Sequence, residues 1–186
     1  MNGLAKVSLV AAAVTAAVVS FATRKVASTP LSSLHSSNLI ARFVSTPDQH
    51  VDVYQVTLSK PTSVEHFAKA FFQSPVFQVE RGLLSLAGAA KTTDAEIDAM
   101  TFASGDHVAT FRVIESKQDE ILFCWDDTEA WNGHSWVAVK DNGHTLLFGS
   151  TLRNRRAFIR RVMPLHLMYA QIVLASAKFQ LERTTS

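Results

Sequence analysis

One stretch near the carboxyl terminus gathers residues that could do chemistry, because Pro164, His166 and Tyr169 interrupt an apolar helical pattern. A proline inside a helix removes a backbone hydrogen bond and clashes with the preceding turn, so we expect a kink or a break at Pro164. His166 then falls in the first turn of a buried leg, where unpaired backbone N–H groups disfavour an imidazolium. We predict a neutral His166 hydrogen-bonded to a strand. The alternative is a polar contact with a ligand at the mouth of a cavity.

No second group completes a catalytic or metal site in the sequence. Cys124 lies in an apolar run, which favours a buried, inert thiol over a nucleophile. Asp126 and Asp127 are neighbours, so on a strand they would point to opposite faces, and we expect a turn there. The chain shows no zinc or iron spacing, no glycine-rich phosphate loop and no G-x-S-x-G motif. We therefore predict no catalytic residue, no metal and no cofactor, and the sequence leans away from an enzyme.

The composition fits one folded domain with an appendage. The chain has 186 residues, of which 47% are apolar, and a net charge of +2. That length can bury a proper core. Basic and acidic residues are spread along the chain and are not sorted into separate halves, so nothing in the sequence suggests a nucleic-acid binder. The sequence leaves the oligomeric state open.

The amino-terminal segment is an address or an anchor. Residues 7–23 carry no charge and are rich in Val, Ala and Leu, and Arg24 and Lys25 close the run. As a helix they would span about 26 Å, slightly less than a hydrocarbon core of about 30 Å. A membrane anchor is the main prediction. A secretory signal cleaved after Ala22 and a mitochondrial transit peptide, favoured by the absence of acidic residues before Asp48, are the alternatives.

The rest of the chain alternates helical and strand patterns. We predict an anchor or targeting segment at 1–27, a serine-rich tether at 28–49 and a folded domain at 50–183. The domain begins with a strand at 51–58, followed by a helix capped by Thr62 with Glu65 in a capping box, and a second helix at 79–86. Strands are expected at 107–115, 120–126, 135–140 and 145–152, with a hairpin at Asn142-Gly143. A last helix, apolar on two faces to about residue 182, is expected to be mostly enclosed.

This order of elements, together with several short motifs, resembles a known superfamily. The motifs are 72–77 (FQSPVF), 81–84 (RGLL), 119–122 (DEIL), 135–139 (SWVAV) and 156–166 (R-x-F-I-x-x-V-x-P-L-H). They are similar to the uncharacterised family of domains numbered 2867, within the helix-grip superfamily that includes START lipid-transfer domains and Bet v 1. Arg155 stands where that family often has a glycine. The resemblance implies an α+β fold in which a curved antiparallel sheet wraps around a long C-terminal helix, with an apolar cavity between them.

Two sets of residues follow as predicted sites. Inward-facing residues would line the cavity and bind a ligand: Phe111, Phe123, Trp125, Trp136, Phe148, His166 and Tyr169. Basic residues would face anionic lipid headgroups: Arg155, Arg156, Arg160 and Arg161. We predict a domain that binds a hydrophobic small molecule or lipid and sits at a membrane. The alternative is a cyclase- or hydratase-like enzyme acting on an apolar substrate in the same cavity. A structural domain with a filled core is the third hypothesis.

Overall fold

A seven-stranded antiparallel sheet forms the middle layer of the protein. The computed structural model describes residues 23–86, 88, 90–129, 131–153 and 157–184. The strands are β1 (Ala27–Ser28), β2 (Gln49–Thr57), β3 (His107–Val108), β4 (Phe111–Ser116), β5 (Glu120–Asp126), β6 (Gly133–Lys140) and β7 (Thr145–Arg153). Their order in the sheet is β1-β2-β7-β6-β5-β4-β3. The short strands β1 and β3 are therefore the outermost strands of the sheet.

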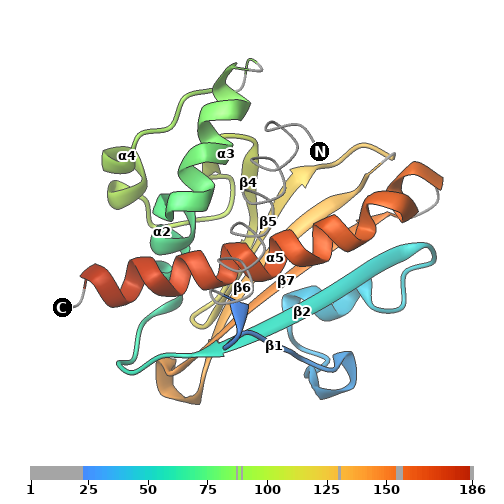
Figure 1. Ribbon diagram of the computed structural model, residues 1–186, viewed down its shortest axis with the longest axis horizontal. Coiled ribbons are helices and arrows are strands. Elements are labelled where there is room, and N and C mark those ends of the chain that lie inside the picture. Colours follow the sequence, from blue (N-terminus) through green and yellow to red (C-terminus); the bar gives the residue numbers. More distant parts are fainter. Residues whose placement is uncertain (1–22, 87, 89, 130, 154–156, 185–186) are drawn as a thin grey trace, which may run out of the picture.

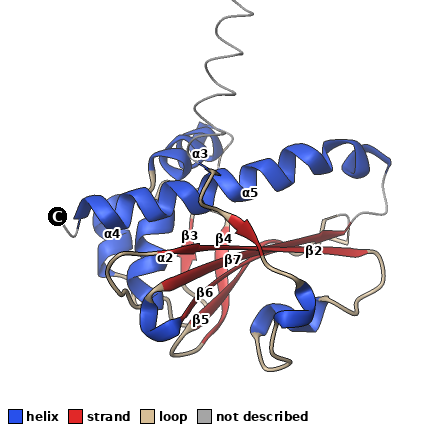
Figure 2. Cartoon of the chain, turned by 60° about the horizontal axis from the view of Figure 1, so that its bottom comes forward, coloured by secondary structure: helices blue, strands red, loops and turns tan. Residues whose placement is uncertain are grey.

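Helices cover one face of this sheet, which we call the inner face. They are α2 (Val64–Gln73), α3 (Pro75–Leu86), α4 (Asp94–Ala99) and α5 (Ala157–Thr184). Figure 1 shows α5 crossing the strands, and Figure 2 shows α3 and α5 on the same side of the sheet. The predicted α+β class, with a curved antiparallel sheet and a long C-terminal helix packed against it, is confirmed.

Helix α2 supplies the aromatic centre of the inner core. Phe67, Phe71 and Phe72 recur at helical spacing and are buried against the strands. Phe72 contacts the rings of Phe77, Phe102, Phe111 and Phe123 within about 6 Å between centroids. The predicted cap at Thr62 is wrong by one residue, because Ser63 is the N-cap and its hydroxyl accepts a hydrogen bond from the His66 N–H.

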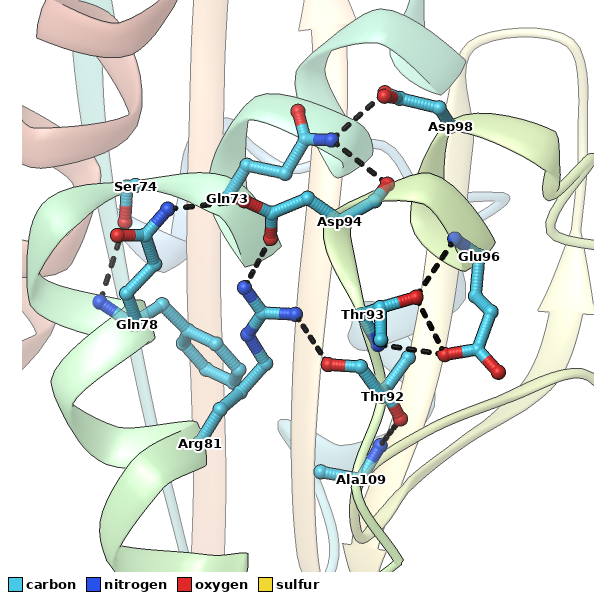
Figure 3. A network of polar contacts seen from close by, with 11 residues as sticks. Gln73, Ser74, Gln78, Arg81, Thr92, Thr93, Asp94, Glu96, Asp98 and Ala109 are labelled. Carbon is cyan, nitrogen blue, oxygen red and sulfur yellow. Dashed lines mark hydrogen bonds and ion pairs between the residues drawn. The ribbon is translucent and has the colours of Figure 1, made fainter.

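Two features of the helical layer differ from the prediction. Helix α3 begins at Pro75 rather than at 79, because a proline is well suited to the first position of a helix. Helix α4 was not predicted, although Thr93 and Glu96 form a capping box around its first turn. Figure 3 shows how α4 is tied to its neighbours: Arg81 on α3 binds the Asp94 carboxylate and the Thr92 carbonyl, and Gln73 on α2 donates to Asp98.

The segment predicted as a tether packs against the sheet instead. Its two 3-10 helices, η1 (Leu31–Ser33) and η2 (Leu39–Phe43), cover the outer face of the sheet. Leu39 and Ile40 are buried there, and a β-carbon at Gly149 would collide with Ile40. The prediction of a tether rested on the serines of this segment and overlooked its apolar residues, which are Leu31, Leu34, Leu39, Ile40 and Phe43. The folded unit therefore begins well before residue 50.

The predicted turns are confirmed. Strands β6 and β7 are joined through a single 3-10 turn, η3 (Asp141–Gly143), in which Asn142 and Gly143 adopt positive φ angles. Asn and Gly tolerate this left-handed backbone better than other residues. Strand β5 ends at Asp126, whose carboxylate accepts a hydrogen bond of 2.8 Å from the Thr128 N–H.

Helix α5 corrects two predictions. It runs through Pro164 as one helix of 28 residues, so of the expected kink or break the break is absent. It is also not enclosed, because only the face that includes Ala170, Leu174, Ala177 and Leu181 is buried, against α2 and the strands β2 and β7. The opposite face exposes large apolar side chains: Phe158, Leu165, Met168, Tyr169 and Phe179. A sheet can cover only one side of a helix that lies across it, so the second apolar stripe stays at the surface.

Helix α5 is also the one described helix that is long and apolar enough to cross a membrane by length and composition. Core helices of soluble domains meet the same criterion. The segment predicted as an amino-terminal anchor, residues 7–23, lies outside the described residues except for Thr23.

Candidate functional site

A cavity of about 350 Å³ lies between the inner face of the sheet and the helices α3 and α5. This volume falls within the range of about 300–1,000 Å³ that is usual for small-molecule sites. Most of the lining is apolar. The residues that line it are Phe71, Phe77, Glu80, Leu84, Thr110, Phe111, Trp125, Ser135, Phe148, Ser150, His166, Tyr169, Ala170 and Val173.

Five of the seven residues predicted to bind a ligand lie on this cavity, and two do not. Phe111, Trp125, Phe148, His166 and Tyr169 are part of the lining. Phe123 faces inward but packs beneath Phe72 and Phe102, away from the cavity. Trp136 lies on the outer face, because the alternation of β6 points Ser135 and Val137 inward. Its indole N–H donates to the buried Glu120 carboxylate.

A row of polar side chains crosses three neighbouring strands at the cavity. Asp52 on β2 pairs with Ser150 on β7, and Ser150 pairs with Ser135 on β6. Ser135 and Ser150 line the cavity, and Asp52 lies next to Ser150 on the neighbouring strand β2, outside the lining. His166 from α5 reaches the same point, with its Nε2 atom 2.8 Å from the Ser150 hydroxyl. The prediction that His166 is hydrogen-bonded to a strand agrees with this geometry.

The two hydrogen bonds of the Ser150 hydroxyl have different donors. The Ser150 hydroxyl donates its single proton to Asp52 Oδ1, 2.7 Å away. The proton between Ser150 and His166 must then come from the Nε2–H group of the histidine. In a neutral ring this leaves Nδ1 of His166 as the acceptor. A serine nucleophile needs the opposite polarity, in which the ring nitrogen takes the serine proton, whereas the Ser150 hydroxyl donates to Asp52.

Two buried polar atoms beside this row have no hydrogen-bond partner in the structure. They are Oδ2 of Asp52 and Nε2 of His50, which lies 3.6 Å from Asp52 Oδ1. Burial lowers the pKa of His50, and its proximity to His166 lowers it further, although the Asp52 carboxylate acts in the opposite direction. The Asp52 carboxylate thus has two imidazoles close to it, with Nε2 of His50 and Nε2 of His166 each 3.6 Å from its Oδ1 atom.

The side chains of Glu80 and Tyr169 meet between α3 and α5 at the cavity. The Tyr169 hydroxyl donates to Oε2 of Glu80. Burial raises the pKa of Glu80, partly offset by this hydrogen bond. Burial and the neighbouring carboxylate both raise the pKa of Tyr169 well above its usual range. The pair therefore favours a protonated tyrosine and a carboxyl group that is harder to ionise than usual.

This raised pKa gives a testable pH dependence. The folded protein holds the Glu80 proton more tightly than the unfolded chain does, so the stabilisation is full below the ordinary glutamate pKa and is lost as the pH rises through the folded-state pKa. We expect Glu80→Gln, which keeps an acceptor for Tyr169, to unfold at higher urea concentration than the wild type at about pH 8 and to match it near pH 4. A variant less stable than the wild type at the higher pH would contradict this expectation.

The predicted basic surface is described only in part. Arg155 and Arg156 lie outside the described residues. Arg160 and Arg161 are exposed on the first turns of α5. No group of three or more His, Cys, Asp or Glu side chains within the described ranges could hold a metal ion.

Sequence reasoning missed the polar row across the strands, and with it the partners of His166. Asp52, Ser135 and Ser150 are single polar residues within apolar strands, far apart in the chain. The only local signal is the phase of β2, where Asp52 shares a face with the buried Tyr54 and Val56. Strand register brings the three together, and register is a property of the pairing rather than of one segment.

Comparisons of the chain with protein-family models, with curated proteins and with solved structures give no match in any of the three.

Proposed function

We propose that this protein binds a hydrophobic small molecule or lipid in the cavity between α3, α5 and the sheet. The observation that carries the proposal is the cavity itself, about 350 Å³ with aromatic and aliphatic walls and a polar row at one side. A filled structural core would leave no such space, since protein interiors are close-packed. The ligand suited to this lining is an amphiphile, with an apolar body against Phe77, Phe148 and Val173 and a polar end near Ser150 and His166.

The fold assigned in this proposal is the helix-grip fold, within the superfamily that the motifs resemble. Its support is the order of elements, in which a first long strand is followed by helices, a run of antiparallel strands and one long terminal helix on the sheet. The position of the cavity, between the sheet and that helix, supports it as well. Membrane attachment through residues 7–23 is the second part of the proposal, supported by their uncharged, apolar sequence.

Ligand uptake can be tested directly with the full chain. The purified protein is examined by native mass spectrometry, first as isolated and then after delipidation and incubation with dodecanol or dodecanoate. We expect a co-purified apolar molecule, or uptake of one of the two probes with one-to-one stoichiometry. Absence of any bound species in both experiments would refute the proposal. The comparison of the two probes reports whether the polar row prefers a hydroxyl or a carboxylate.

A second candidate function is proton transfer to a substrate in the same cavity, as in a cyclase or hydratase. The observation that favours it is the chain of hydrogen bonds from Asp52 through Ser150 to His166, which leaves Nδ1 of a neutral His166 as an acceptor. Tyr169 is the other candidate acid. If a substrate is found, His166→Gln and Tyr169→Phe should each lower turnover while the protein still binds that substrate. Unchanged turnover in both variants would remove these residues from the mechanism.

A further inference from the structure

We infer that the solvent face shared by α3 and α5 is a docking surface for an anionic lipid bilayer, through which the cavity exchanges its ligand. The role in exchange rests on the proposed binding function, whereas the surface itself is read from exposure and charge alone. We call it the α3–α5 face. Its apolar members are Val79, Leu83 and Leu86 on α3 and Phe158, Leu165 and Met168 on α5.

These side chains are exposed rather than packed. Val79, Leu83 and Leu86 follow one another at spacings of four and three residues, so they share one side of α3, and each is at least 62% exposed. On α5, Leu165 and Met168 share a side in the same way, with Phe158 two turns earlier. Single exposed apolar residues are ordinary, but two stripes on adjacent helices are not.

The two stripes adjoin. Helices α3 and α5 contact each other at two points: the Val76 N–H donates to the Ser176 hydroxyl at 3.3 Å, and Tyr169 donates to Glu80. The contacts run in opposite order along the two helices, so α3 and α5 lie side by side and antiparallel. Leu83 follows Glu80 by three residues and Leu165 precedes Tyr169 by four, so each lies on the same side of its helix as a residue of that contact, and both stripes run along the seam between the helices.

This seam borders the cavity. Glu80 and Leu84 on α3 and His166 and Tyr169 on α5 line the cavity below the seam. The Glu80–Tyr169 hydrogen bond therefore crosses the boundary between the cavity and the α3–α5 face. An apolar ligand that passes between these helices would leave the cavity next to exposed Leu83 and Leu165, and not directly into water.

Charge identifies the occupant as an anionic lipid surface. The first half of α5, from Ala157 to Tyr169, contains Arg160 and Arg161 and no acidic residue, and Arg161 is exposed. Apolar side chains with interspersed arginines are typical of helices that lie in the headgroup region of a bilayer.

The start of the described chain agrees with this orientation. Val26 packs against the inner core cluster, on the side of the sheet that carries α5. The uncharged apolar residues 7–22 lie immediately before the described chain, and Arg24 and Lys25 are exposed at its start. The described chain therefore begins on the helical side of the protein and not on the side of η1 and η2.

The experiment uses the full chain labelled at single engineered cysteines with an environment-sensitive NBD fluorophore. Labels are placed at Leu83→Cys and Met168→Cys, and the matched control is Ser45→Cys, an exposed position after η2. Cys124 is buried, and labelling of the unsubstituted chain corrects for any reaction there. Adding vesicles of phosphatidylcholine with phosphatidylglycerol should raise NBD emission about twofold or more, with a blue shift, at positions 83 and 168 and not at 45.

Further variants separate this surface from the proposed function. Leu83→Glu combined with Met168→Glu should retain uptake of dodecanol while a label at Leu165→Cys loses its vesicle response. Arg161→Gln should weaken the response to anionic vesicles and leave the response to pure phosphatidylcholine unchanged. The inference is overturned if labels at 83 and 168 do not respond, or if the label at 45 responds equally. It is also overturned if they are already blue-shifted without lipid, which would mean that the amino-terminal segment or a second copy covers the face.

Discussion

Ala170→Phe is expected to lower the affinity of the protein for dodecanol about tenfold or more while the chain still folds. Ala170 lies on the buried face of α5 and lines the cavity, so a phenyl ring at this position extends into the space that the ligand would occupy. Filling an existing void costs less than overpacking a close-packed core, so the free energy of unfolding should change little. Isothermal titration with dodecanol and urea denaturation measure the two quantities.

The control for this variant is Ala175→Phe. Ala175 lies on the same helix but is not part of the lining, and it is only partly buried. The Ala175→Phe variant carries the same additional ring on α5, but this ring does not enter the cavity. The affinity of this variant for dodecanol should therefore match that of the wild type. Equal losses of affinity in the two variants would show that the ligand does not bind in this cavity.

The largest loss of stability is expected from Glu120→Ala, with a decrease of about 3 kcal/mol in the free energy of unfolding. The Glu120 carboxylate is buried on the outer face of the sheet. Its Oε2 atom accepts hydrogen bonds of 2.8 Å from the Leu39 N–H and from the Trp136 indole, and its Oε1 atom lies 3.1 Å from Lys117 Nζ. Removing it leaves two buried donors without an acceptor and detaches η2 from the sheet.

Two comparisons test this interpretation by urea denaturation. Glu120→Gln keeps an acceptor oxygen and should lose less stability than Glu120→Ala. Glu129→Ala removes a glutamate that is almost fully exposed and 3.9 Å from Arg153, so its effect should be close to zero. If Glu120→Ala were no more costly than Glu129→Ala, the outer layer would not depend on this carboxylate.

Local patterns in the sequence predicted the elements of the inner layer well. Alternation in residues 120–126 gave the inward positions of Ile121, Phe123 and Trp125, and the Asn142-Gly143 pair gave the β6–β7 hairpin. The prediction that Trp136 faces the cavity was wrong. Both faces of the sheet are covered, so an aromatic residue between Ser135 and Val137 can be buried on either face. That second covering was itself missed, since serines obscured the apolar residues of η1 and η2.

The candidate site was less accessible to sequence reasoning than the fold. The aromatic lining could be named in advance, because large apolar residues on inward positions must meet beneath a packed helix. The polar row could not, since Asp52, Ser150 and His166 become neighbours only through strand register and the placement of α5. The burial of α5 was overestimated. Two apolar stripes on one helix are compatible with a buried helix, and they are equally compatible with one buried stripe and one exposed stripe.

The two-residue strands at the borders of the sheet have a consequence for solubility. Longer outer strands would offer a ladder of unpaired amide and carbonyl groups on which another chain could nucleate a cross-β contact. Here β1 pairs with the middle of β2, and the Thr29 N–H continues that cover by donating to the Val53 carbonyl. Backbone bonds from the loop at Gly105 and Asp106 continue the cover of β4 beyond β3. Although apolar side chains of α3 and α5 are exposed, few backbone groups at the borders of the sheet are therefore open to pairing with a strand of another chain.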